Sequence, residues 1–310
     1  KQFDYKNGYV NKYIPTKYLL KEVPKGWEGD LPEFIGNLIH HILGYDQTVI
    51  DHFINDLADL IQTRKKRITS FLMQGTEGTG KGLFFSEVIM KIIGENYCTT
   101  NNMNAFKSQF NSFLSDNIMV LVNEVSGNFS SNEKMNIDLT EVIKIAITDE
   151  HIQLEGKNIN RYNGKNHCSF MFATNRDHGL IIPDDDRRFT VAPRQEEKIH
   201  DIDWWPGYTE MKKHLASELQ DFVWYLKTYP VDKGKIGRVL DNKSKQLLQV
   251  MSKTNADEFF EAIDRGDLTW IYNNLVPKGG YGSEDEYVRI KSLLPITPEE
   301  KVISLKDLCG

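Results

Sequence analysis

Residues 71–82 read FLMQGTEGTGKG, and this stretch decides how the chain is expected to fold. The apolar run 68–73 leads into it, and an amphipathic segment over 83–93 follows. A strand, a glycine loop and a helix in this order give a G-x-x-x-x-G-K match the context of a phosphate-binding site. The residues expected to form that site are Gly75, Thr76, Glu77, Gly78, Thr79, Gly80, Lys81 and Gly82.

The chemistry of this loop comes from its backbone and from one lysine. Glycines let the backbone fold back so that its N–H groups point inward, and the following helix N-terminus adds a partial positive charge. Lys81 is expected to reach the β- and γ-phosphates of a nucleotide. Gly82 departs from the pattern, because a Ser or Thr normally gives a hydroxyl to Mg²⁺ there. A plain glycine-rich turn is the alternative, and the flanking segments disfavour it.

The composition predicts a globular protein. The chain has 310 residues, of which 40% are hydrophobic and 26% charged, enough for two domains. No signal peptide or membrane-length apolar run is present, so we expect a soluble cytoplasmic protein without a membrane partner. Cys98, Cys168 and Cys309 lack metal or disulfide spacing. The net charge of −6 restricts any nucleic-acid contact to a local basic patch, and the start at Lys1 predicts a piece of a longer chain.

Two apolar runs end in side chains suited to phosphoryl chemistry. The run 118–122 predicts a central strand of a parallel sheet and ends in Asn123 and Glu124. At such a strand end, Glu124 can orient and deprotonate a water. The alternative is a structural role for Glu124 as the neighbour of a helix N-cap. Asn123 stands where an Asp is usual and gives a cation no charge. The run 169–173 ends near Asn175, which can hold the attacking water or a γ-phosphate oxygen.

Basic residues form three further groups. Residues 151–167 predict one or two hairpins, with turns at 155–158 and at Asn163–Gly164. Lys157 on a hairpin tip, with Asn158 and Arg161 beside it, is a phosphate-contact candidate, and an exposed lysine without a role is the alternative. Arg187 and Arg188 on the loop before a short strand are suited to stabilising phosphoryl charge, against the alternative of surface ion pairs. The run 64–67 is interpreted as a solvated corner.

The order and spacing of these motifs resemble a superfamily 3 helicase of the AAA+ type. The resemblance covers about residues 60–195 and is greatest to the helicase domains of phage, plasmid and poxvirus primase-helicases and primase-polymerases. It implies that the glycine loop binds ATP with Mg²⁺, that Glu124 is the Walker B glutamate, with Asn123 beside it at the metal, and that Asn175 is the sensor. Lys157 matches the pore hairpin that grips single-stranded DNA.

The resemblance also implies partners and an assembly. Arg187 or Arg188 matches the arginine finger offered to the nucleotide of a neighbouring subunit, which implies a homo-oligomeric ring, normally a hexamer. A covalently linked primase or polymerase domain is expected, in the cytoplasm of a phage-infected or element-bearing host, with the nucleus also allowed. If neither Gly82 nor Asn123 is compensated, slow hydrolysis is expected, yet Glu124, Asn175 and both arginines favour an active ATPase.

The fold expected from these observations is α/β: a three-layer α/β/α P-loop ATPase core of the AAA+ superfamily 3 type. The core spans 64–200, after a linker or strap over 1–30 and a collar-like helical region over 31–63. Residues 201–310 form a C-terminal helical region, for which a winged-helix-like module fits. Helices are expected within 31–62 on either side of residue 44, and over 104–114, 130–148, 208–229, 243–251 and 257–263.

Three functions follow from this interpretation. The first is an ATP-driven DNA helicase that translocates on single-stranded DNA during replication. The second is a nucleotide-stabilised ring that acts as a clamp or assembly module for a primase-polymerase, with weak or no hydrolysis. The third is a small-molecule P-loop kinase, which Asn175, the arginine pair and the lack of a lid disfavour.

Overall fold

The computed structural model describes residues 3–4, 9–107, 111, 113–123, 133–156, 159–176, 180, 182–252, 262 and 265. The chain divides into a compact unit Lys1–Ser252 and a second unit Lys253–Gly310. All helices and strands named below belong to the first unit. None of its described helices is both long and apolar enough to span a membrane.

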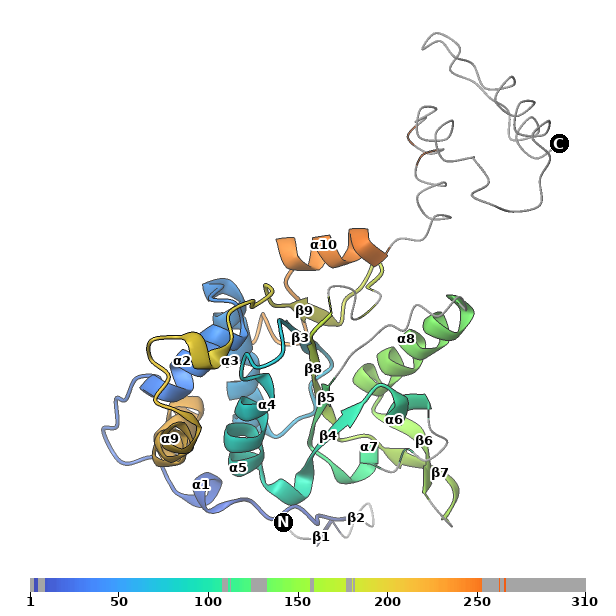
Figure 1. Ribbon diagram of the computed structural model, residues 1–310. Coiled ribbons are helices and arrows are strands. Elements are labelled where there is room, and N and C mark those ends of the chain that lie inside the picture. Colours follow the sequence, from blue (N-terminus) through green and yellow to red (C-terminus); the bar gives the residue numbers. More distant parts are fainter. Residues whose placement is uncertain are drawn as a thin grey trace, which may run out of the picture. The chain divides into compact units, whose positions relative to one another are not determined.

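A five-stranded parallel sheet forms the centre of the first unit (Figure 1). Its strands are β4 (Cys98–Asn102), β5 (Met119–Asn123), β8 (Ser169–Thr174), β3 (Ser70–Gln74) and β9 (Phe189–Val191), in that spatial order. β8 therefore lies between β5 and β3, although it follows both in the sequence. Parallel pairs place the carboxyl ends of all five strands at one edge. The predicted α/β class is confirmed.

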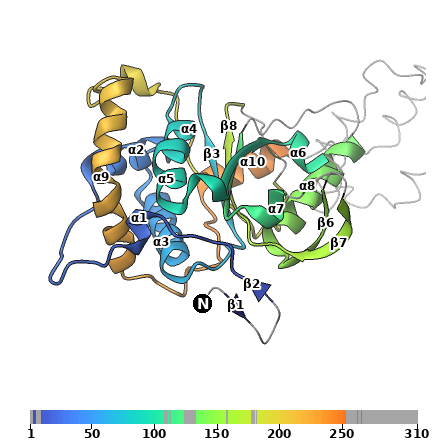
Figure 2. The same ribbon diagram turned by 90° about the horizontal axis from the view of Figure 1, so that it is seen from below.

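Side chains of each strand alternate between two hydrophobic cores. Phe71 and Met73 face the core that contains the helices α2 (Glu33–Ile42), α3 (Gln47–Thr63), α4 (Lys81–Phe84), α5 (Met90–Ile93) and α9 (Tyr208–Thr228). Leu72 faces the opposite core, to which α6 (Asn104–Lys107), α7 (Phe113–Asp116), α8 (Glu133–Thr148) and the hairpin of β6 (His151–Gly156) and β7 (Ile159–Lys165) belong. Figures 1 and 2 show these two sets of elements on opposite sides of the sheet.

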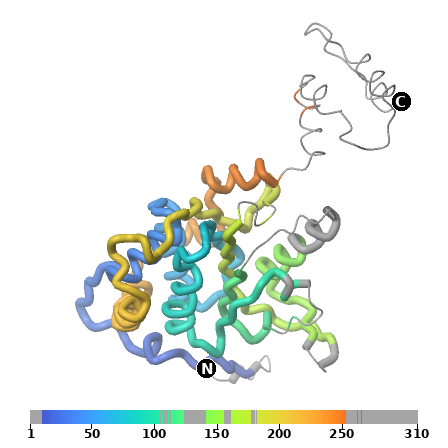
Figure 3. The backbone as a smooth tube through the Cα atoms, viewed as in Figure 1, coloured from blue at the N-terminus to red at the C-terminus, as the bar shows by residue number. Residues whose placement is uncertain are grey.

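The remaining described elements are short. A π-helical turn (Phe85–Ile89) joins α4 to α5, and 3₁₀ turns cover Glu95–Tyr97 and Ile199–Asp201. The N-terminal segment contains β1 (Phe3–Asp4), β2 (Tyr9–Val10) and α1 (Lys17–Leu20) and passes along α5 (Figure 3). The hydroxyl groups of Tyr13 and Thr16 donate to the carbonyls of Ile93 and Ile92, which fastens this segment to the end of α5.

The structure corrects two sequence predictions on the second face. Residues 104–114 form two short helices because Asn111, between them, pairs with β6: its amide donates to Gln153 O at 2.9 Å and accepts from Glu155 N at 2.8 Å. The turn predicted at Asn163–Gly164 is wrong, since both residues lie inside β7 opposite Gln153 and Ile152. Gly164 is needed there because a Cβ would lie 2.2 Å from Leu154 Cδ1.

The sequence missed one strand, and its remaining helix predictions are confirmed where the structure describes them. β4 was not predicted, because its polar Thr and Asn residues alternate between partly buried and exposed positions. The helix expected over 257–263 falls outside the described residues apart from residue 262. The helices expected over 130–148, 208–229 and 243–251 correspond to α8, α9 and α10 (Lys243–Ser252).

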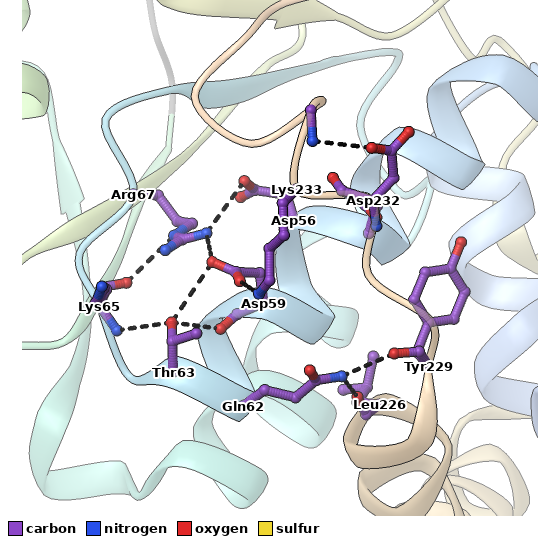
Figure 4. A network of polar contacts seen from close by, with 12 residues as sticks. Asp56, Asp59, Gln62, Thr63, Lys65, Arg67, Leu226, Tyr229, Asp232 and Lys233 are labelled. Carbon is purple, nitrogen blue, oxygen red and sulfur yellow. Dashed lines mark hydrogen bonds and ion pairs between the residues drawn. The ribbon is translucent and has the colours of Figure 1, made fainter.

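The basic run 64–67 is a solvated corner only in part: Arg64 and Lys65 are exposed, whereas Lys66 and Arg67 connect layers of the structure. Lys66 Nζ donates to the carbonyls of Ala146 and Ile147 at 2.8 and 2.7 Å, at the C-terminal end of α8, and burial lowers its pKa to about 8. The Arg67 guanidinium is buried and bonds to Asp59, which also binds Lys233 (Figure 4). Lys66 and Arg67 are thus structural cations, at a helix C-terminus and beside carboxylates.

The Arg67 network contains a carboxyl group with an abnormal pKa. Asp56 lies 3.7 Å from Arg67 Nη1, but that guanidinium is already neutralised by Asp59. Burial therefore dominates and raises the pKa of Asp56 from 3.8 to about 7. Burial alone would also raise the pKa of Asp59, but hydrogen bonds from Lys233 and Arg67 outweigh it and lower that pKa.

We predict that Arg67→Met strongly destabilises the protein while Lys65→Met does not. Removing Arg67 leaves the buried Asp59 carboxylate without its closest partner, which costs about 3–5 kcal/mol for a broken buried pair. Lys65 is an exposed member of the same run and serves as the matched control. Urea denaturation of both variants measures the effect. Equal free energies of unfolding for the two would contradict the structural role of Arg67.

A second prediction concerns pH. Because the pKa of Asp56 is raised on folding, its contribution to stability is fully present below pH 3.8 and is lost as the pH rises through about 7. Wild type should lose roughly 1 kcal/mol per pH unit between pH 5 and 7 relative to Asp56→Asn. Asp51→Asn, which changes an exposed carboxylate on the same helix, is the control. A constant difference between wild type and Asp56→Asn across this range would refute the raised pKa.

Candidate functional site

The glycine loop connects β3 to α4 at the carboxyl edge of the sheet. Gly78 and Gly80 have φ angles of +88° and +89°, in the left-handed region that favours glycine. A Cβ on Gly80 would also lie 2.8 Å from Ile199 Cδ1 and 3.0 Å from Leu38 Cδ1. Conformation and packing therefore both require a glycine at position 80.

The segment that follows β9 pairs with the start of the glycine loop. Gly75 forms a parallel bridge with Gln195, and a Cβ on Gly75 would lie 2.4 Å from Gln195 O. Thr76 N donates to the same carbonyl at 3.0 Å. The Gln195 side chain is buried and its Nε2 donates to His41 O on α2 at 3.1 Å. No sequence pattern pointed to Gln195, because its contacts are long-range.

Lys81 places its ammonium group at the centre of the loop. Its Nζ donates to Gly75 O at 2.9 Å, Thr76 O at 3.1 Å and Thr79 Oγ1 at 2.8 Å. Burial and, to a smaller extent, the positive charge of Arg194 lower the pKa of Lys81 to about 8, and the negative charge of Glu196 opposes them. At neutral pH the group is still mostly cationic, so the loop presents a partly desolvated positive charge.

A pocket of about 230 Å³ opens in front of this loop. Asn123 at the end of β5 and Asn175 just after β8 reach it, and Ala173 of β8 also lines it. The other lining residues are Glu77, Gly78, Thr79, Gly80, Lys81 and Gly82. The structure thus brings the loop, Asn123 and Asn175 together as the sequence predicts. Glu124 lies outside the described residues.

The arginine pair lies at the opposite edge of the sheet. Arg188 precedes β9, and its carbonyl accepts a hydrogen bond from Ser70 N, at the start of β3. The pocket lies beyond Gln74, where β3 ends. Five residues of strand separate the two points by roughly 15 Å. Arg187 and Arg188 therefore do not line the pocket of their own chain.

The predicted DNA contacts are described only in part. Lys157 and Asn158 lie outside the described residues. Arg161, on β7, is exposed, and its guanidinium forms an ion pair with Glu155 at 2.8 Å on the neighbouring strand.

Arg194 is a further cation beside the pocket. Its Nη2 donates to Asn175 O at 3.1 Å, and its Nε donates to Glu196 Oε1 at 2.5 Å. Its charge also contributes to the lowered pKa of Lys81. The sequence offered one signal for it: Arg194 follows a short apolar strand, as the other pocket residues do.

Nothing among the described residues forms a group of three or more His, Cys, Asp or Glu side chains fit to hold a metal ion. Asn123 brings an amide oxygen to the pocket, and Gly82 leaves open space, since a Cβ there would have no neighbour within 4 Å. Mg²⁺ commonly keeps several waters and binds through one or two carboxylates and substrate phosphates. The described residues fit an ion held chiefly by phosphate and water.

Comparisons with known proteins find similarity to part of a phage protein. The chain is 29% identical over 267 residues to the DNA primase-polymerase of Nitratiruptor phage NrS-1; the match covers 86% of this chain and 36% of that protein. The chain thus spans about a third of this relative's length. A model for a family of unknown function, DUF5906, matches residues 73–188.

Solved structures agree with the sequence comparison. An apo structure of the NrS-1 C-terminal region has a TM-score of 0.75 and 26% identity, and covers 92% of this chain and 67% of that chain. The A-form apo structure of the same region has a TM-score of 0.72 and 25% identity, and covers 93% of this chain and 67% of that chain. The X-ray structure of JCV helicase scores 0.37 at 10% identity over 84% of this chain and 64% of that chain, too low to carry an argument. The chain is therefore similar in sequence and fold to the C-terminal region of a phage primase-polymerase, an enzyme of DNA replication.

We predict opposite effects on stability from alanine at two neighbouring glycines. Gly80→Ala places a residue with a side chain in a left-handed conformation and brings its Cβ too close to Ile199 and Leu38, which costs about 1–3 kcal/mol. Gly82→Ala, in a helical conformation with open space around it, stabilises by up to about 1 kcal/mol. Urea denaturation of the two variants checks both signs. A loss of stability in Gly82→Ala as large as that in Gly80→Ala would contradict the loop geometry.

Proposed function

We propose that this chain is an ATP-dependent DNA helicase module with a P-loop ATPase core of the AAA+ superfamily 3 type. The observation that carries the proposal is the shared pocket at the carboxyl edge of the sheet. There the Lys81 ammonium lies inside a glycine loop, and Asn123 and Asn175 reach the same space from two neighbouring strands. The similarity to a phage primase-polymerase supports a role in the replication of phage or mobile-element DNA.

Each residue has a stated task in this proposal. The loop N–H groups and Lys81 bind the triphosphate, and Asn175 orients the attacking water or a γ-phosphate oxygen. Glu124 takes the proton of that water. Bound Mg²⁺ supplies charge neutralisation at the phosphates, and Asn123 can accept a hydrogen bond from a metal-bound water. Arg194 holds the Asn175 backbone in place through its carbonyl.

The arginine pair argues for an oligomer. Arg187 and Arg188 lie at the amino edge of the sheet, roughly 15 Å from their own pocket by strand length, which supports a role at the pocket of a neighbouring copy. We therefore propose a closed homo-oligomeric ring, a hexamer by resemblance, with single-stranded DNA contacted by Lys157, Asn158 and Arg161. A linked primase or polymerase domain, as in the relative, completes the protein.

An assembly module is the second candidate. Gly82 and Asn123 both remove groups that usually organise Mg²⁺, and an interaction lost only in the transition state lowers turnover directly. In this case the same ring binds nucleotide and acts as a clamp or loader for a primase-polymerase, with weak or no hydrolysis.

ATP hydrolysis with and without single-stranded DNA tests the proposal. We expect DNA-stimulated turnover that falls at least about 100-fold in Lys81→Ala, the size seen when one charge-stabilising donor is removed. Lys91→Ala, which changes an exposed lysine on α5 paired with Glu95, is the control. Assembly is followed by analytical ultracentrifugation. Full turnover in Lys81→Ala would overturn the ATPase proposal, and an assembled, nucleotide-bound but inactive wild type would establish the assembly module.

A further inference from the structure

Helix α10 forms hydrogen bonds to the loop that precedes the arginine pair. Lys245, Gln249 and Ser252 are spaced by four and three residues, so they lie on one side of the helix. Each bonds to the backbone of residues 182–186. Lys245 Nζ donates to Asp186 O at 2.6 Å, and Ser252 Oγ accepts from Ile182 N at 3.1 Å. Gln249 Nε2 donates to the carbonyls of Pro183 and Asp184 at 3.0 and 3.1 Å.

The burial pattern of α10 is the reverse of that in an ordinary surface helix: a lysine is buried and apolar side chains are exposed. Lys245 is 3% exposed, while Leu247 and Val250 are 61% and 62% exposed. Surface helices usually bury their apolar side chains and leave lysines in water. Only Leu248 of this helix enters the hydrophobic core. The polar contacts with the loop therefore specify where α10 lies.

A chain of buried polar contacts connects Lys245 to the arginines. The Asp186 carboxylate is 1% exposed and lies 3.3 Å from Lys245 Nζ. The same carboxylate oxygen, Oδ1, accepts from Arg188 N at 3.0 Å and from Phe189 N at 2.9 Å. Asp186 thus fixes the backbone on both sides of the Arg188 Cα, and Lys245 fixes Asp186 by its charge and by its bond to the Asp186 carbonyl.

We propose that α10 positions the arginine loop and that Lys245 is the positioning residue. This inference rests on the proposed function, in which Arg187 and Arg188 act on the nucleotide of a neighbouring copy. Lys245 touches no nucleotide, because it lies at the amino edge of the sheet with the arginine loop. Its loss therefore lowers kcat and leaves the KM for ATP unchanged, since the pocket of each chain is intact.

Steady-state ATP hydrolysis by the assembled protein tests this role. Lys245→Met should lower kcat about 100-fold at unchanged KM, because a misplacement of about 1 Å at a catalytic group costs that much. Lys243→Met, which changes an exposed lysine on the same helix, is the matched control and should leave both constants unchanged. Gln249→Leu keeps the charge pair and should lower kcat in the same direction by less. Equal kcat values in Lys245→Met and Lys243→Met would overturn the inference.

Mixed assemblies separate positioning from general damage. A Lys245→Met subunit keeps a sound pocket and has displaced arginines, whereas a Lys81→Ala subunit has sound arginines and a defective pocket. Mixing the two should restore turnover above the sum of the separate proteins, because one subunit's arginines then serve the other's pocket. Failure to restore it, in mixtures shown to co-assemble, would show that Lys245 supports the fold of its own pocket.

Hydrogen–deuterium exchange tests the contact independently of hydrolysis. The amides of Arg188 and Phe189 donate to Asp186, so Lys245→Met and Gln249→Leu should speed exchange in the peptide covering 186–190 but leave the peptide covering 75–82 unchanged. Lys243→Met should change neither. Unchanged exchange at 186–190 would refute the positioning role. Faster exchange there in the two variants, combined with no ATP turnover by the wild type, would refute the proposed ATPase while showing that α10 holds the loop.

Discussion

The parallel pairing of β3 with β8 on one side and with β9 on the other is the constraint on which the site depends. Parallel strands end at a common edge, so β3, β5 and β8 deliver the glycine loop, Asn123 and Asn175 to one pocket. The same pairing puts the residues before β9 at the other edge. Within one chain the arginine pair and the pocket are therefore separated, and the proposed chemistry combines them through a second copy.

Buried cations hold the layers around this sheet. Lys66 reaches the carbonyls at the end of α8, Arg67 binds the acids of α3, and Lys245 binds the arginine loop. Each removes a long charged side chain from water, which is unfavourable unless the charge is paired and hydrogen-bonded. In return each contact has a fixed direction, which hydrophobic packing alone lacks. These three sites specify how helices are placed on the sheet.

The sequence predicted the features that depend on local pattern. The glycine loop, the α/β class and the strand ends at Asn123 and Asn175 follow from periodicity and from residue spacing. The long-range contacts could not be predicted. A basic run usually lies in water, and nothing in 64–67 shows that acids on α3 enclose Arg67. Asn163–Gly164 resembled a turn in the sequence. The glycine instead leaves room for the side chain of Leu154 on the paired strand, and this contact cannot be recognised from local sequence.

The electrostatics of the pocket concern the attraction of an anion, which is a separate question from the hydrolysis of a nucleotide. Without an anion, Lys81 is partly desolvated and near the charge of Arg194, and both effects lower its pKa to about 8. An anion in the pocket relieves both, because it restores a partner for the ammonium group and screens the neighbouring cation. This attraction requires no hydroxyl at Gly82 and no carboxylate at Asn123. Under the proposed function, affinity for phosphates would therefore reside in the loop and its cations, whereas turnover would depend on Glu124 and on arginines that α10 positions for another subunit.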